Sequence, residues 1–240
     1  MPQPPTYLVI PAGGRGVRMG GGIPKQFREW RGRPLLLATL EAFFQPGMPP
    51  LAGIAVAVPP DRLEEVRAWI LPCPLLVVAG GDSRQDSVAA ALAALPGEPG
   101  SAVLIHDGVR PFPPAGPIQA ALEALTRWDG ALLGEPSTDT LKRVGPDGQV
   151  LGTEPREALF RAQTPQVARL GTWRKAFQAA REAGVQATDD VALLERLGLR
   201  VLLVESPATN LKVTTPEDWS RITPQGVVPG PTPTAPQSIV

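Results

Sequence analysis

The sequence predicts an α/β protein in which a mostly parallel β-sheet is covered by helices on both faces. Short, fully apolar runs alternate with amphipathic or alanine-rich segments of helical length. Each apolar run is followed by glycine, proline or polar residues. Runs without polar residues are typical of strands buried on both sides, as in parallel sheets. In such a sheet, ligands bind beyond the carboxyl ends of the strands.

Strands and helices are expected to alternate through most of the chain. The expected strands are residues 6–11, 53–58, 75–79, 102–105, 130–134 and 200–205. The expected helices are residues 34–44, 61–70, 87–95, 117–126, 172–183 and 189–197, with a last helix from residue 216. Together they predict a single Rossmann-like domain over residues 1–223.

Local signals mark where two of the helices begin. Asp61 is expected to cap the second helix. The buried face of that helix would carry Leu63, Val66 and Ile70. The run Ser83-Arg84-Gln85-Asp86 matches a capping box, in which a serine and an acidic residue three positions later each accept a hydrogen bond from the other's backbone.

Residues 137–160 depart from this pattern and predict a projecting β-hairpin arm. The stretch is largely polar, and Pro146-Asp147-Gly148 forms a turn between two short extended runs. An isolated hairpin is marginal in water, so we expect the arm to pack against something, such as a second subunit. Residues 224–240 are rich in proline, glycine and threonine and are expected to be disordered.

Composition narrows the class of protein. The formal net charge is zero, and this lack of a basic excess argues against nucleic acid as the main partner. Cys73 is the only cysteine, so no intrachain disulfide can form and a reducing cytoplasm is expected. We expect neither a signal peptide nor a membrane span, because no run approaches the roughly 20 apolar residues that a span requires.

A glycine-rich loop after the first strand indicates a site for a polyphosphate. Gly13, Gly14 and Gly16 leave backbone N–H groups free to face anionic oxygens. Arg18 and Lys25 add two positive charges a few residues later.

Two common phosphate-binding loops do not fit this stretch. A Walker loop needs Gly-Lys-Ser/Thr, whereas Lys25 stands between a proline and a glutamine. A dinucleotide fingerprint beginning at Gly14 needs a glycine where Met19 stands. The loop instead resembles the signature of nucleotidyltransferases that join a nucleoside monophosphate to a sugar or polyol phosphate.

Further motifs extend the resemblance over residues 6–222. In chain order they are Pro11-Ala12-Gly13-Gly14-x-Gly16-x-Arg18-Met19, Pro24-Lys25-Gln26, Gly80-Gly81-Asp82-Ser83-Arg84-x-Asp86-Ser87-Val88, His106-Asp107-x-x-Arg110-Pro111, Asp139-Thr140-x-Lys142, Thr164-Pro165-Gln166, Thr188-Asp189-Asp190 and Asn210-Leu211-Lys212-Val213-Thr214. On these motifs the chain resembles the 2-C-methyl-D-erythritol 4-phosphate cytidylyltransferase family. It departs from the usual family pattern at Gly13, at Gly108-Val109 and at Arg161-Ala162-Gln163.

The resemblance implies that CMP is transferred from CTP to the phosphate of methylerythritol phosphate, with release of pyrophosphate, in the non-mevalonate isoprenoid pathway. The attacking phosphate is already ionised near neutral pH, so the task is to bring two polyanions together in line. By resemblance, Arg18, Lys25 and Lys212 are the catalytic cations. Mg²⁺ is expected on the triphosphate, with Asp107 as a candidate ligand.

The resemblance also assigns the binding residues. The nucleotide would be bound by Ala12, Gly13, Gly14, Gly81, Asp82 and Ser87. The acceptor would be bound by Asp107, Arg110, Thr140, Arg156, Thr164 and Thr188. In the family the arm belongs to the neighbouring subunit, which implies a homodimer. His106, the only histidine, is expected to have a positional role.

Three alternatives stay open at this point. A ribitol-phosphate cytidylyltransferase would share the loop chemistry and differ mainly in the arm. A regulatory module could bind CTP without turnover, although Arg18, Lys25 and Lys212 are all present. An NAD-dependent dehydrogenase on a similar sheet is disfavoured by the failed dinucleotide fingerprint.

Overall fold

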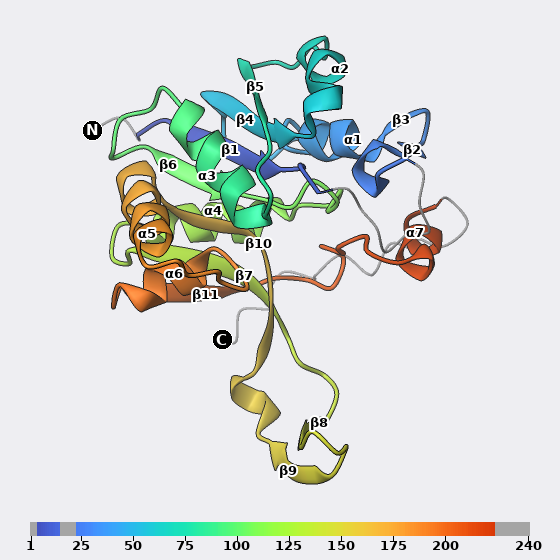
Figure 1. Ribbon diagram of the computed structural model, residues 1–240, viewed down its shortest axis with the longest axis vertical. Helices are drawn as coiled ribbons and strands as arrows, with labels where there is room; N and C mark the ends of the chain where they lie inside the picture. Colours follow the sequence, from blue (N-terminus) through green and yellow to red (C-terminus); the bar gives the residue numbers. More distant parts are fainter. Residues whose placement is uncertain (1–3, 15–22, 224–240) are drawn as a thin grey trace, which may run out of the picture.

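A seven-stranded sheet forms the centre of the computed structural model, which describes residues 4–14 and 23–223 (Figure 1). The strand order is β11-β7-β10-β6-β1-β4-β5. The strands are β1 (Thr6–Pro11), β4 (Gly53–Val58), β5 (Leu75–Ala79), β6 (Ala102–Ile105), β7 (Gly130–Pro136), β10 (Phe160–Arg169) and β11 (Val201–Glu205). The glycine-rich loop therefore leaves from a central strand.

The sheet is mostly parallel, as predicted, with one reversed strand inside it. β1 pairs in parallel with β4 and β6, β4 with β5, and β11 with β7. β10 runs antiparallel to both β6 and β7. The chain leaves the sheet at the end of β7, forms the arm and returns as β10, so the two legs of the arm are neighbouring strands (Figure 1).

Helices cover both faces of the sheet. They are α1 (Leu35–Ala42), α2 (Leu63–Arg67), α3 (Arg84–Ala94), α4 (Ala115–Ala124), α5 (Leu170–Glu182), α6 (Val191–Arg196) and α7 (Pro216–Ile222). Along β1, Tyr7 and Val9 join a core with α3, α5 and α6, whereas Leu8 and Ile10 join a core with α1, α2 and α4. Burial on both faces explains why these strands lack polar residues.

A third, smaller core packs the segment around α7 against residues 30–38. Ile222 and Val213 pack with Trp30 and Leu35, and the short strands β2 (Glu29–Trp30) and β3 (Arg33–Pro34) form a hairpin beside α7 (Figure 1). The Trp30 indole Nε1 donates a hydrogen bond to the Ile222 carbonyl at 2.9 Å. This contact brings the segment that carries Lys212 next to the segment after the glycine-rich loop.

The second predicted helix is shorter than expected. A 3₁₀ turn, η3 (Pro60–Arg62), comes first, and α2 ends at Arg67. Asp61 lies in the 3₁₀ turn and makes no capping bond. Because the helix has ended, Ile70 is 95% exposed instead of lying on the buried face. The prediction for Asp61 and Ile70 was therefore wrong.

The arm extends away from the body of the protein (Figure 1). Its tip is the hairpin of β8 (Leu141–Val144) and β9 (Val150–Glu154), and the turn η4 (Arg156–Ala158) leads back to β10. Gly148 has a φ of 84°, a left-handed conformation that the predicted turn requires. The expected proline-rich tail, residues 224–240, lies outside the described residues.

None of the described helices combines the length and the apolar character needed to cross a membrane.

Candidate active site

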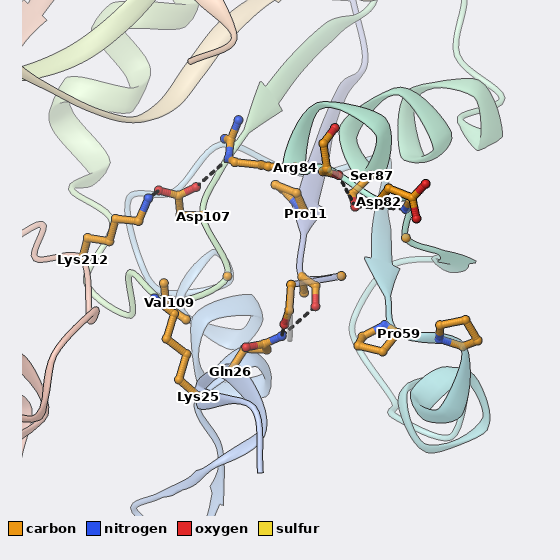
Figure 2. A pocket seen from close by; sticks show the side chains of 18 residues that line it. Pro11, Lys25, Gln26, Pro59, Asp82, Arg84, Ser87, Asp107, Val109 and Lys212 are labelled. Carbon is orange, nitrogen blue, oxygen red and sulfur yellow. Dashed lines mark hydrogen bonds and ion pairs between the residues drawn. The ribbon is translucent and has the colours of Figure 1, made fainter. Parts of the chain in front are cut away.

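A cavity of about 850 Å³ opens where β1, β4, β5 and β6 end. Its lining comes from residues 11–14, 25–26, 59–60, 80–84, 87, 107–109 and 212, and Figure 2 shows these side chains around one hollow. The cavity thus lies at the carboxyl edge of the sheet, where the sequence predicted a ligand.

The glycine-rich loop is held by a close approach of two backbones. A Cβ atom on Gly13 would lie 3.1 Å from the Gly80 Cα and 2.8 Å from the Ser87 Oγ. The Gln26 side chain is buried, and its Nε2 donates to the carbonyls of Ala12 at 2.8 Å and Gly14 at 2.7 Å (Figure 2). Gln26 therefore fixes the described start of the loop, residues 12–14, a role not assigned from the sequence although its Pro-Lys-Gln motif was recognised.

The predicted capping box at the start of α3 is confirmed. The Ser83 Oγ accepts from the Asp86 N–H at 3.0 Å, and the Ser83 N–H donates to Asp86 Oδ2 at 3.1 Å. The Ser87 hydroxyl accepts from the Gly81 N–H at 3.2 Å and donates to the Ser83 carbonyl at 3.0 Å. These bonds shape the 80–83 loop and leave Asp82 exposed at the cavity.

Among the described residues that line the cavity, Asp107 is the only buried carboxylate, and three cations surround it. Its Oδ1 lies 3.2 Å from the Arg84 Nε, and its Oδ2 lies 2.9 Å from the Lys212 Nζ (Figure 2). The Arg110 Nε lies 3.5 Å from the same Oδ2. Burial alone would raise the pKa of Asp107, but Arg84, Lys212 and Arg110 hold it well below its usual range.

Two of the three predicted catalytic cations line this cavity. The Lys25 Nζ donates to the Val213 carbonyl at 3.0 Å, directly after Lys212 in the chain. The two lysines therefore meet in one site although they lie near opposite ends of the sequence. Arg18, the third predicted cation, lies outside the described residues.

The segment that carries Lys212 is anchored by Asn210, which belongs to a recognised motif but was given no role from the sequence. The Asn210 Nδ2 donates to the Gln163 Oε1 at 2.9 Å and to the Thr164 carbonyl at 2.8 Å. The Asn210 carbonyl accepts from the Arg110 Nη1 at 2.6 Å. One fully buried residue thus connects β10, the loop after β6 and the segment of Lys212 through its side chain and its backbone carbonyl.

His106 lies fully buried beneath Asp107. Its Nε2 donates to the Arg110 carbonyl at 3.0 Å, so its Nδ1 accepts from the Thr164 hydroxyl at 3.1 Å. That hydroxyl in turn accepts from the Asp107 N–H at 3.0 Å. Burial lowers the pKa of His106 to about 4, which keeps the ring neutral. The geometry fits a positional role better than a catalytic one.

The six predicted acceptor-binding residues do not all meet in this cavity. Arg110 and Thr164 contact Asp107 directly but are buried behind the lining, and Thr188 is exposed on the loop before α6. Thr140 and Arg156 line a separate hollow of about 310 Å³ on the arm. Of the described residues that line the main cavity, none comes from the arm.

Asp107 is the candidate metal ligand among the residues that line the cavity. No three His, Cys, Asp or Glu side chains gather as a metal cage anywhere in residues 4–14 and 23–223. Both Asp107 oxygens already face cations. Asp107 is thus better placed to balance the charge of the surrounding basic groups than to serve as a main ligand for Mg²⁺.

Residues 6–223 match the family model for 2-C-methyl-D-erythritol 4-phosphate cytidylyltransferase. Curated proteins of that name from Xanthomonas campestris pv. campestris (strain B100) and Xylella fastidiosa (strain 9a5c) are 44% identical over 222 residues and 43% identical over 224 residues. Each alignment covers 90% of this chain, with 82% and 94% of the relatives, respectively.

Solved structures give the same answer. The Francisella tularensis cytidylyltransferase superposes with a TM-score of 0.76 at 29% identity, covering 90% of this chain and 97% of that one. The cytidylyltransferase from Thermus thermophilus has a TM-score of 0.72 at 35% identity, covering 91% and 97%. On its motifs, its sheet and these matches, the chain belongs to the 2-C-methyl-D-erythritol 4-phosphate cytidylyltransferase family.

Proposed function

We propose that this chain carries out the reaction of its family. It transfers CMP from CTP to 2-C-methyl-D-erythritol 4-phosphate, giving 4-diphosphocytidyl-2-C-methyl-D-erythritol and pyrophosphate, in the non-mevalonate isoprenoid pathway. The observation that carries the proposal is the cavity at the sheet edge, where Lys25 and Lys212 line one hollow together with Gly13 and Gly14. Two cations and free backbone N–H groups are what two reacting polyanions need.

The lysines supply electrostatic stabilisation and need no general base beside them. The attacking phosphate oxygen is ionised near neutral pH, so no proton has to be removed from it. Lys25, with Arg18, would hold the triphosphate and offset charge that develops on the α-phosphoryl oxygens. Lys212, held 2.9 Å from Asp107, would lie between the acceptor phosphate and that phosphorus.

The nucleotide would lie across the loops after β1 and β5. Ala12, Gly13 and Gly14 form the first loop, and Gly81 and Asp82 form the second. Bonds from Gln26 and Ser87 hold both loops in place before any ligand arrives. A rigid, hydrogen-bonding pocket of this kind discriminates strongly between bases, because the wrong base leaves polar groups unpaired.

A homodimer would complete the acceptor site. Thr140 and Arg156 lie on the arm, away from the cavity of their own chain. The arm also exposes large apolar side chains, with Val150 58% and Leu151 55% exposed. A second subunit that covered these side chains could place its arm over the cavity and bring Arg156 to the acceptor phosphate.

The metal and the compartment complete the proposal. Mg²⁺ would be carried mainly by the triphosphate oxygens, since the described residues offer it no cage of their own. Bound there, it would neutralise part of the triphosphate charge.

The lone Cys73, which cannot form an intrachain disulfide, supports a cytoplasmic location.

The test is pyrophosphate release by the purified protein with CTP, Mg²⁺ and either methylerythritol phosphate or ribitol phosphate. We expect turnover with methylerythritol phosphate alone. Lys212→Ala should lower kcat about 10²- to 10³-fold, the usual effect of losing one preorganised donor. It should still fold, because Arg84 and Arg110 continue to pair with Asp107.

Lys175→Ala is the matched control, because Lys175 is an exposed lysine on α5 and does not line the cavity. Its activity should equal that of the wild type. Measurable CTP binding without pyrophosphate release from either acceptor would reject the proposed function and favour a regulatory nucleotide-binding module.

A further inference from the structure

The Arg84 guanidinium lies between two carboxylates at the edge of the cavity. Its Nη1 and Nη2 bind the two oxygens of Asp190, each at 2.8 Å, and its Nε faces Asp107 Oδ1 at 3.2 Å. Arg84 is the first residue of α3, and Asp190 immediately precedes α6. The two helices are therefore joined by one arginine that also contacts the buried carboxylate of the site.

The backbone at Asp190 is held in place by the sheet. The Gln166 Oε1, on β10, accepts from the backbone N–H groups of Asp190 at 2.9 Å and Val191 at 2.8 Å. The Gln166 Nε2 donates to Asp189 Oδ2 at 2.9 Å. The Asp190 side chain is buried, so the sheet fixes the backbone from which its carboxylate reaches Arg84.

The paired Nη1 and Nη2 donors of Arg84, its fork, determine which carboxylate it binds more fully, because a guanidinium binds a carboxylate best through two parallel hydrogen bonds. Asp190 takes those two bonds, so Arg84 meets Asp107 through Nε alone and only at Oδ1. Asp107 Oδ2 is left to Lys212 and Arg110. Without the Asp190 charge, the fork of Arg84 could turn to both oxygens of Asp107 and displace Lys212.

We propose that Asp190 is a positioning residue for the transfer reaction. Asp190 pairs with both terminal nitrogens of Arg84, so Arg84 does not compete with Lys212 for Asp107 Oδ2. In this way Asp190 determines the position of the Lys212 ammonium. The activity readout for this inference rests on the proposed function, because Lys212 is the group whose placement would limit transfer.

The experiment compares Asp190→Asn, Arg84→Gln and the double variant in the full chain. Asp190→Asn is isosteric and should lower kcat about 10- to 100-fold, as misplacement of a reacting group does, with the KM for CTP unchanged. Adding Arg84→Gln removes the group that would displace Lys212. The double variant should therefore have a higher kcat than Asp190→Asn, a rescue that general loss of structure would not produce.

A second readout needs no turnover. The chain has four lysines, Lys25, Lys142, Lys175 and Lys212, so ¹³C-methylation of lysines gives few NMR signals, and Lys212→Arg assigns the one of interest. In Asp190→Asn the Lys212 signal should shift while the Lys175 signal stays in place. A wild type without transfer activity would reject the proposed function alone, because this shift would still be measured.

Either of two results would overturn the inference. One is an Asp190→Asn variant with wild-type kcat and an unmoved Lys212 signal. The other is a double variant whose kcat falls as far as that of Lys212→Ala. If Asp190→Asn alone does not fold, the double variant still decides, because it removes both charges together and should keep kcat well above that of Lys212→Ala.

Discussion

At the scale of single residues, His106 gives the clearest prediction of pH dependence. It is the only histidine, and burial lowers its pKa from 6.5 to about 4 in the folded chain. Between these values the unfolded chain binds more protons than the folded chain, so stability falls as the pH falls. Lowering the pH from about 7.5 to about 5 should therefore reduce the free energy of unfolding by about 2 kcal/mol through His106.

Urea unfolding at the two pH values measures this loss, with His106→Gln as the control. Glutamine can still donate to the Arg110 carbonyl but does not titrate, so the variant should lose less stability on acidification. An equal loss in both proteins would mean that carboxylates, and not His106, are responsible.

At the scale of elements, two capping boxes support different parts of the site. The Ser83 Oγ accepts from Asp86 at the start of α3, and the Thr215 Oγ1 accepts from Asp218 at the start of α7. Ser83→Ala and Thr215→Ala should each cost about 1 kcal/mol in the free energy of unfolding. Their effects on catalysis should differ, because α3 follows the nucleotide loop and α7 follows the segment of Lys212.

We expect Ser83→Ala to raise the KM for CTP and Thr215→Ala to lower kcat with the KM for CTP unchanged. Steady-state kinetics beside thermal unfolding separate the two effects, and each variant is the stability-matched control for the other. Changes in the same kinetic parameter would show that the loss of stability alone determines activity.

Local signals explain which elements the sequence could predict. The strands β1, β4, β5 and β6 and the α3 capping box follow from neighbouring residues, and the structure confirms them. β10 was not predicted, because Gln163, Thr164 and Gln166 are polar and find partners far away in the chain, among them Asn210, His106 and the loop before α6. The Asp190–Arg84 pair is equally non-local, with its members 106 positions apart in the chain.

At the scale of the whole molecule, the proposed dimer makes a prediction that no monomer can satisfy. Arg156→Ala would disable the arm, and Lys212→Ala would disable the cavity. If the arm acts on the partner, an equal mixture that has exchanged subunits should regain about a quarter of wild-type activity, because half of the dimers are mixed and each has one complete site.

Pyrophosphate release after exchange measures the recovery, and sedimentation equilibrium shows whether a dimer is present. A mixture of Arg156→Ala with Thr140→Ala is the control, since both variants alter the arm and no complete site can form. No recovery in the first mixture would mean that the arm does not complete a partner's site.

The contact between Lys25 and the Val213 carbonyl also has a consequence during protein synthesis. Lys25 and Val213 are 188 positions apart in the chain, and Ile222 of α7 packs against Val213, beside the second lysine. The two lysines can therefore come together only after every residue from Lys25 to α7 has left the ribosome. A nascent chain that stops before Lys212 should thus hold no CTP in a reactive geometry.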